Sequence, residues 1–80
     1  GGTIVENQTV EIHYGLGLAS DVHIDLVSLT GETIRTYTTD ILQPGEYRQT
    51  IDMSGLAAGV YGVRFRGGIF SETSMIVLQK

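Results

Sequence analysis

The sequence has 80 residues, enough for one small domain with a modest hydrophobic core. Cysteine is absent, which excludes disulfide bonds and thiolate metal sites. The formal charge is −4 with only five lysines and arginines, a balance that argues against a nucleic-acid-binding surface. Isoleucine, valine and threonine supply 24 residues and alanine only 3, which favours strands over helices. No apolar run approaches the ~20 residues of a membrane helix, so the composition predicts a soluble all-β domain.

The first half of the chain predicts four strands, at residues 9–14, 22–29, 32–39 and 46–51. In the first of them Val10, Ile12 and Tyr14 alternate with polar residues, as in a half-buried strand. An antiparallel pairing of the first two strands, with position numbers that sum to 36, sets Val10 against Leu26 and Ile12 against Ile24. Because the apolar partners match, this pairing predicts a hairpin with a long loop.

Glycines mark the turns between these strands. Gly31 turns the chain toward the third strand, and the Pro44–Gly45 pair fits the two central positions of a type II turn. The second half of the chain predicts strands at residues 59–66 and 69–78, joined by a two-residue hairpin turn at Gly67 and Gly68.

This last hairpin has an awkward register. A strict pairing sets Phe65 against Phe70 but Val63 against Glu72, so a bulge near Glu72 and Thr73 is expected. Six or seven short strands, separated by regular turn signals, predict an Ig-like antiparallel β-sandwich.

The two ends of the chain carry further expectations. Residues 1–8 are expected to be a linker or an expression remnant, and residues 9–80 a single sandwich domain. The apolar run at residues 75–78 continues almost to Lys80, so Lys80 is expected to be a natural C-terminus and the last strand to lie at a sheet edge.

The hairpin of the first two strands would also set His13 against His23 and Glu11 against Asp25. Two imidazoles and two carboxylates on one exposed face are potential zinc or calcium ligands. The favoured interpretation of these four residues is a solvated outer face, with no metal and no cofactor.

Catalytic motifs are missing from the sequence. No serine stands in a Gly-x-Ser-x-Gly context, and Gly15 and Gly17 are not followed by the third glycine of a dinucleotide-binding loop. An enzyme is therefore not expected, and tryptophan, the strongest platform for sugars or single-stranded nucleic acid, is absent.

The most distinctive segment covers residues 52–61. An Asx or ST turn at Asp52 or Ser54 would be followed by Leu56 packing into the end of the core. Gly59 then allows a tight entry into the next strand, where Tyr61 is placed as in a tyrosine corner, its hydroxyl bonded to the preceding crossover. This segment predicts structure and no chemistry.

Taken together, these motifs resemble a known family, the type A C-terminal sorting domains of the type IX (Por) secretion system of Bacteroidetes. The resemblance covers roughly residues 10–80 and is most specific over residues 56–63. Two positions depart from the family pattern: Gly62 replaces a bulky apolar residue, and Ser74 stands near the usual place of a lysine. The matching positions are Val22, Ile24, Leu26, Gly31, Asp52, Ser54, Leu56, Gly59, Tyr61, Ile76, Val77 and Leu78.

The resemblance implies a sorting signal that carries an N-terminal cargo from the periplasm across the outer membrane to the cell surface or the medium. The implied partners are the outer-membrane translocation machinery and a sortase-like peptidase that removes the domain and attaches the cargo to lipopolysaccharide. Recognition is expected on one turn and on the last strand, and edge strands could also form a homodimer. The recognition residues are expected to be Gly59, Val60, Tyr61, Met75, Ile76, Val77, Leu78 and Lys80.

The alternative is a non-catalytic Ig-like spacer, similar to the modules of FlgD type, that supports a neighbouring enzyme or adhesin. Those modules share the Val-x-Ile-x-Leu pattern at Val22 and the Gly-x-Tyr pattern at Gly59. Since a fold does not imply a function, the fold by itself does not separate the two hypotheses.

Overall fold

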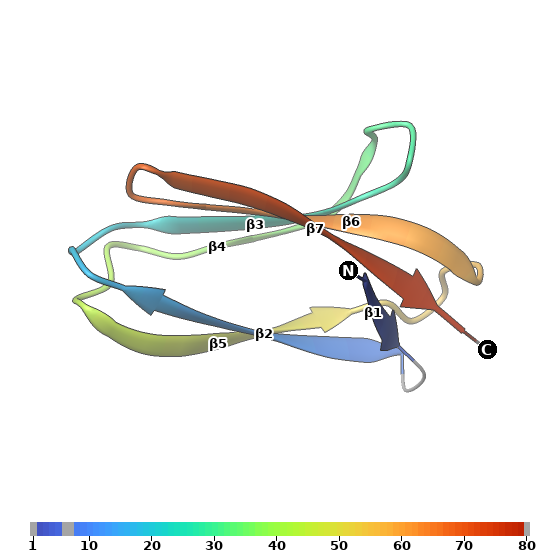
Figure 1. The fold of residues 1–80 in the computed structure, drawn as a ribbon, viewed down its shortest axis with the longest axis horizontal. Helices are drawn as coiled ribbons and strands as arrows, with labels where there is room; N and C mark the ends of the chain where they lie inside the picture. Colours follow the sequence, from blue (N-terminus) through green and yellow to red (C-terminus); the bar gives the residue numbers. More distant parts are fainter. Residues whose placement is uncertain (1, 6–7, 80) are drawn as a thin grey trace.

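The computed structural model describes residues 2–5 and 8–79, and in these ranges the chain is all β. Two layers of strands face each other (Figure 1). The fold predicted from the sequence, an Ig-like β-sandwich of about seven strands, is confirmed. The strands are β1 (Gly2–Val5), β2 (Thr9–Leu16), β3 (Val22–Val27), β4 (Thr33–Thr38), β5 (Gly45–Asp52), β6 (Gly59–Gly67) and β7 (Phe70–Leu78).

The two sheets differ in size. One has five strands in the order β1-β7-β6-β3-β4, and the other contains only β2 and β5. All pairs are antiparallel except β1 with β7, where Gly2 lies beside Met75 and Val5 beside Leu78. The small sheet is too narrow to cover the whole inner face of the large one.

The core lies between the sheets. Alternate residues of β3 point inward, so that Val22, Ile24 and Leu26 are fully buried. Ile51 from the end of β5 and Met53 just after it are also fully buried. Each such side chain contributes about 1.5–3 kcal/mol of burial free energy, and β6 and β7 complete the cluster with Val63, Ile76 and Leu78.

The predicted hairpin between the first two strands is wrong. β2 pairs with β5, with Val10 opposite Ile51, and β3 pairs with β4 and β6. After β2 the chain crosses to the other layer, where a single bridge joins Ser20 to Leu42. β2 and β3 thus face each other across the core, which brings apolar residues together just as a side-by-side pairing would.

The bulge predicted near Glu72 and Thr73 is also wrong. β6 and β7 pair without interruption from Gly59 opposite Leu78 to Gly67 opposite Phe70. The turn lies one residue later than expected, at positions 68–69, and begins with Gly68 at φ 62°. This shift restores the register without a bulge, and it places Glu72 opposite Phe65 on the inner face.

Two expectations for loops and edges are overturned as well. Gly45 has φ 156°, far from the roughly +80° of the third residue of a type II turn, and it opens β5 directly. The last strand is not at a sheet edge, because β1 covers β7 from Met75 to Leu78. β1 itself lies within the segment that we expected to be a linker.

Candidate recognition surface

The loop from β5 to β6 is held by a series of specific hydrogen bonds. Ser54 N donates to Asp52 Oδ1 at 2.9 Å, which forms the Asx turn, and Gly55 follows in the left-handed region at φ 79°. The Tyr61 hydroxyl donates to the carbonyl oxygen of Ala57, the contact of a tyrosine corner. Leu56 packs against the core. Hydrogen bonds from Ser54, and more weakly the charge of Arg35, lower the pKa of Asp52.

Two side chains of β4, which the sequence analysis did not single out, tie this loop to the large sheet. Arg35 Nε donates to Asp52 O and Arg35 Nη2 to Ser54 O, both at 2.8 Å. The Tyr37 hydroxyl accepts from Asp52 N at 2.9 Å. Both residues stand opposite core residues of β3, Leu26 and Ile24. The sandwich is therefore closed along its β4–β5 side by side-chain bonds to the edge backbone.

Gly31 has a local structural role in the β3–β4 turn, at the same end of the sandwich as the β5–β6 loop. Its φ is 88°, and its N–H donates to Ser28 O at 3.0 Å in the turn between β3 and β4. The left-handed backbone there favours glycine.

The two segments expected to be recognised lie side by side. Val60 on β6 is opposite Val77 on β7, and Gly59 is opposite Leu78. Ile76 and Leu78 point into the core and are buried. Met75 and Val77 alternate with them, so they face the outer side of the sheet, and Met75 is 40 % exposed and Val60 39 % exposed. Lys80 lies outside the described residues.

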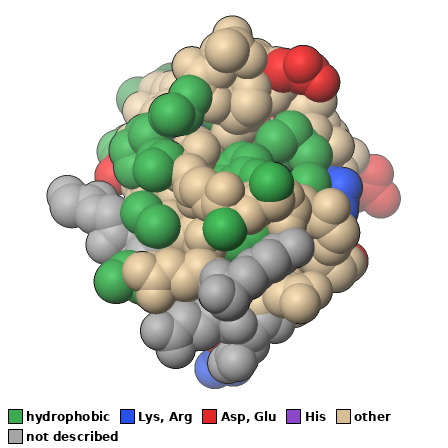
Figure 2. Space-filling model, turned by 90° about the vertical axis from the view of Figure 1, so that its right-hand side faces the viewer, with side chains coloured by type: hydrophobic (Ala, Val, Ile, Leu, Met, Phe, Trp, Pro, Cys, Tyr) green, Lys and Arg blue, Asp and Glu red, His purple; other side chains and the backbone are tan. Residues whose placement is uncertain are grey.

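The outer side of β6 and β7 thus carries an apolar surface, which we call the terminal patch and define as Ile4, Val60, Met75 and Val77. Ile4 of β1 stands beside Val77 and is largely exposed. Figure 2 looks at this end of the molecule and shows several hydrophobic side chains on it, with charged groups around the margins. Tyr61 lies on the opposite face from Val60, against the core, so it shapes the patch without being part of it.

Gly62 borders the terminal patch, opposite Met75 and Val27. A Cβ at this position would lie 3.0 Å from Val27 Cγ2. The missing side chain therefore leaves room for Val27, which is buried although it faces outward. At Gly62, the side chain of Val27 fills the space that a larger residue would occupy.

The four residues considered as metal ligands are not brought together. Glu11 and His13 are on the small sheet, where His13 Nε2 lies 2.6 Å from Glu11 Oε1 and His13 stands opposite Arg48. His23 and Asp25 are on the large sheet. Because the predicted hairpin is not formed, the argument for a shared site is lost, and the described ranges contain no group of three or more potential ligands.

Asp25 has a different role: it is a buried carboxylate bound by two arginines. Only 4 % of it is exposed, and it accepts from Arg64 Nη2 at 2.9 Å and from Arg66 Nη2 at 3.4 Å. Thr36 Oγ1 donates to its other oxygen at 3.0 Å. Burial by itself raises the pKa of Asp25, but the bonds from Arg64 and Thr36 and the two guanidinium charges outweigh it, so the pKa lies below its ordinary value.

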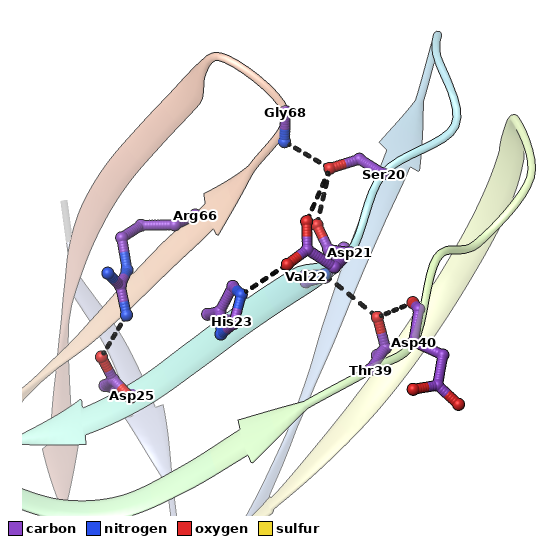
Figure 3. A network of polar contacts seen from close by, with 9 residues as sticks. All are labelled: Ser20, Asp21, Val22, His23, Asp25, Thr39, Asp40, Arg66 and Gly68. Carbon is purple, nitrogen blue, oxygen red and sulfur yellow. Dashed lines mark hydrogen bonds and ion pairs between the residues drawn. The ribbon is translucent and has the colours of Figure 1, made fainter.

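Polar contacts continue along β3 toward the turn that joins β6 and β7 (Figure 3). His23 Nε2 lies 2.9 Å from Asp21 Oδ2, and this bond lowers the pKa of Asp21. Ser20 Oγ accepts from Gly68 N at 2.7 Å and donates to Asp21 O. These bonds hold the segment that crosses between the two layers in place. Arg64 and Arg66 could be noted in the sequence, but their partner Asp25 could not, because the pairing of β3 with β6 was not predicted.

Comparison with known proteins identifies the family. Residues 6–79 match the family described as the secretion system C-terminal sorting domain, the tails of the Por secretion system. Neither the curated proteins nor the solved structures gave a significant match. None of the elements in residues 2–5 and 8–79 is a helix of the length and hydrophobicity that a membrane crossing requires. The family match covers nearly the whole sandwich, and the chain belongs to the C-terminal sorting domains of the type IX secretion system.

Proposed function

We propose that this domain directs a cargo protein, attached at its N-terminal side, across the outer membrane through the type IX secretion system. It acts by protein–protein recognition, without catalysis and without a cofactor. The observation that carries the proposal is the family match over residues 6–79. The cargo passes through the periplasm and reaches the cell surface or the medium, and the domain is then removed by the sortase-like peptidase of the system.

We propose that the translocation machinery recognises the terminal patch. Exposed apolar side chains that cluster on one face are typical of interaction sites. Val60, Met75 and Val77 would make the contacts, whereas Gly59, Tyr61, Ile76 and Leu78 hold the backbone beneath them in place. Recognition would thus require a folded sandwich, because the patch combines residues from three strands.

An export assay with surface variants tests this role. Residues 1–80 are fused behind a signal peptide and a fluorescent reporter, and expressed in a type IX-competent bacterium and in its transport-deficient mutant. Reporter outside the competent cells and trapped in the mutant periplasm is the expected result. The double variant Val60→Thr/Val77→Thr keeps the β-branched shape and removes apolar surface, so we expect it to lower export at least several-fold.

Ile41→Thr serves as the matched control, since Ile41 is an exposed apolar residue in a loop outside the patch. Circular dichroism of each variant checks that the sandwich is folded. Deletion of residues 75–80 would be a poor test, because Ile76 and Leu78 belong to the core. If the folded domain leaves the reporter in the periplasm of both strains, the result supports the alternative function of a structural spacer. If the double variant is exported as well as Ile41→Thr, the translocation machinery does not recognise the terminal patch.

A further inference from the structure

One long side of the sandwich is open. β2 pairs only with β5 among the described residues, so its other edge presents unpaired backbone groups along eight residues, Thr9–Leu16. On the facing sheet, β1 covers β7 only from Met75 to Leu78, which leaves the edge at residues 70–74 uncovered as well. The opposite side, by contrast, is closed by Arg35 and Tyr37.

Between these two free edges lies a groove with a volume of about 530 Å³. β2 forms one wall, from Val10 to Gly15, and the inner face of β6 and β7 forms the other. Phe70 is 58 % exposed there, and its ring meets Phe65 edge-on with centroids 6.3 Å apart. The groove therefore combines unpaired strand edges with apolar side chains that the small sheet leaves uncovered.

The groove also holds a carboxylate without an ion pair to the described residues. Glu72 points inward, opposite Phe65, whereas Glu11 at the β2 wall already contacts His13, another lining residue, at 2.6 Å. Neither lysine nor arginine is among the lining residues, and no ion pair to Glu72 is formed within the described ranges. A carboxylate beside an apolar surface, with no cation of its own, is complementary to a partner that brings one.

We propose that this groove binds an extended segment of another polypeptide, which adds to β2 as a third strand and covers the inner face of β7. Alternate side chains of the segment would be apolar, to contact Phe65 and Phe70, and one would be lysine or arginine, to pair with Glu72. Main-chain hydrogen bonds to a free edge supply affinity in such additions, and the alternate side chains supply specificity. The net charge of −4 favours the approach of a basic partner. The proposal does not depend on the export role.

The test uses a synthetic seven-residue peptide with blocked ends, in which threonine alternates with valine and the central valine is replaced by lysine. It is titrated into the ¹⁵N-labelled domain and followed by NMR. We expect saturable shifts of β2 amides and of the amides at residues 70–74. A peptide with glutamate in place of the lysine should bind at least tenfold more weakly.

Charge reversal gives the decisive comparison. Glu72→Lys should lose at least tenfold in affinity for the lysine peptide and should prefer the glutamate peptide. Asp40→Lys makes the same charge change in the loop after β4 and should bind as the unaltered domain does. A peptide methylated on alternate backbone nitrogens should bind in only one of its two methylation registers, since only one edge of the added strand pairs with β2.

Several outcomes would overturn the proposal. The proposal is wrong if millimolar peptide causes no saturable shifts. It is also wrong if the peptide binds Glu72→Lys and the unaltered domain equally well, in which case Glu72 would only protect the sheet edge from aggregation. Shifts confined to β4 would place the peptide on another edge. A domain that sediments as a dimer but becomes monomeric in Glu72→Lys would assign the groove to a second copy of this chain.

Discussion

At Asp25, a nearly buried carboxylate binds two guanidinium groups and one hydroxyl on the outer face of the large sheet. Such a group is costly to bury unless its charge is compensated. The arginines come from β6 and the threonine from β4, so the contacts join three adjacent strands by their side chains. The network is therefore structural, and its strength depends on the ionisation of one carboxyl group.

Acid should weaken this network in a predictable way. The pKa of Asp25 in the folded state lies below its ordinary 3.8, so the stabilisation is fully present above the unfolded-state value and is lost as pH falls through the folded-state value. We expect Asp25→Asn to lower the free energy of unfolding by about 1–3 kcal/mol at neutral pH, the worth of hydrogen bonds to a charged group. The variant should also lose less stability than the unaltered domain as the pH falls below the ordinary pKa of an aspartate.

Urea unfolding at pH 7, 5 and 3 measures both effects. Asp40→Asn, which removes an exposed carboxylate from the loop after β4, is the control and should follow the unaltered domain. Identical acid dependence of Asp25→Asn and the unaltered domain would contradict the assigned role.

At the scale of the elements, the turn between β6 and β7 sets the register of the whole hairpin. Gly68 takes φ 62°, its N–H donates to Ser20 Oγ, and the following residue, Ile69, is fully exposed. A left-handed backbone costs a residue with a Cβ about 1–2 kcal/mol. Of the two consecutive glycines, only Gly68 adopts the left-handed conformation, so Gly68 and not Gly67 specifies the turn.

Gly68→Ala should lower the free energy of unfolding by about 1–2 kcal/mol and reduce the melting temperature by roughly 4–8 °C per kcal/mol in a domain of this size. Gly68→Asn should lose less, because asparagine tolerates this conformation better. Gly17→Ala is the matched control, since its Cβ would meet nothing within 4 Å and its φ is not in the left-handed region. A loss for Gly17→Ala as large as that for Gly68→Ala would refute the assignment.

Alternation along the chain located the strands from β2 to β7 to within a few residues, because period-2 burial is a local property. It did not determine which strands are neighbours. Val10 and Leu26 are both inward-facing, and an apolar match is satisfied equally by pairing in one sheet or by contact across the core. β1 has only four residues and a parallel partner, Met75–Leu78, more than seventy positions away, so no local signal pointed to it.

The same limit applied to the candidate site. The turn chemistry around Asp52 and Tyr61 could be predicted because each contact spans only a few residues. Arg35 and Tyr37 were missed, since their partners are the backbone atoms of a strand in the other sheet. For Asp25 the sequence favoured a solvated outer face, with a metal ligand as the alternative; its burial against Arg64, 39 positions away, could not be predicted from local pattern.

For the whole molecule, the unequal sheets imply unequal stability. β3 and β6 are paired on both sides in the five-stranded sheet, whereas β2 and β5 pair only with each other in the described ranges and β1 is an edge strand of four residues. Regions with fewer pairings open at lower free energy than the core.

Native-state hydrogen exchange should therefore show a hierarchy. Amides of β3 and β6 should exchange only through global unfolding, and those of β1 should exchange through local opening at a lower free energy. The hydrogen-bonded amides of β2 should lie between these extremes. Uniform exchange free energies across β1, β2 and β3 would mean that the sandwich opens as one unit.

The parallel contact of β1 with β7 also has a mechanical consequence. The two strands run in the same direction, with Gly2 beside Met75 and Val5 beside Leu78. A pull that draws the chain at Gly2 backward and the chain at Leu78 forward therefore acts along the strands and slides one past the other. Under such a load the hydrogen bonds of all four residue pairs are strained together, whereas a pull across the strands would break them one after another.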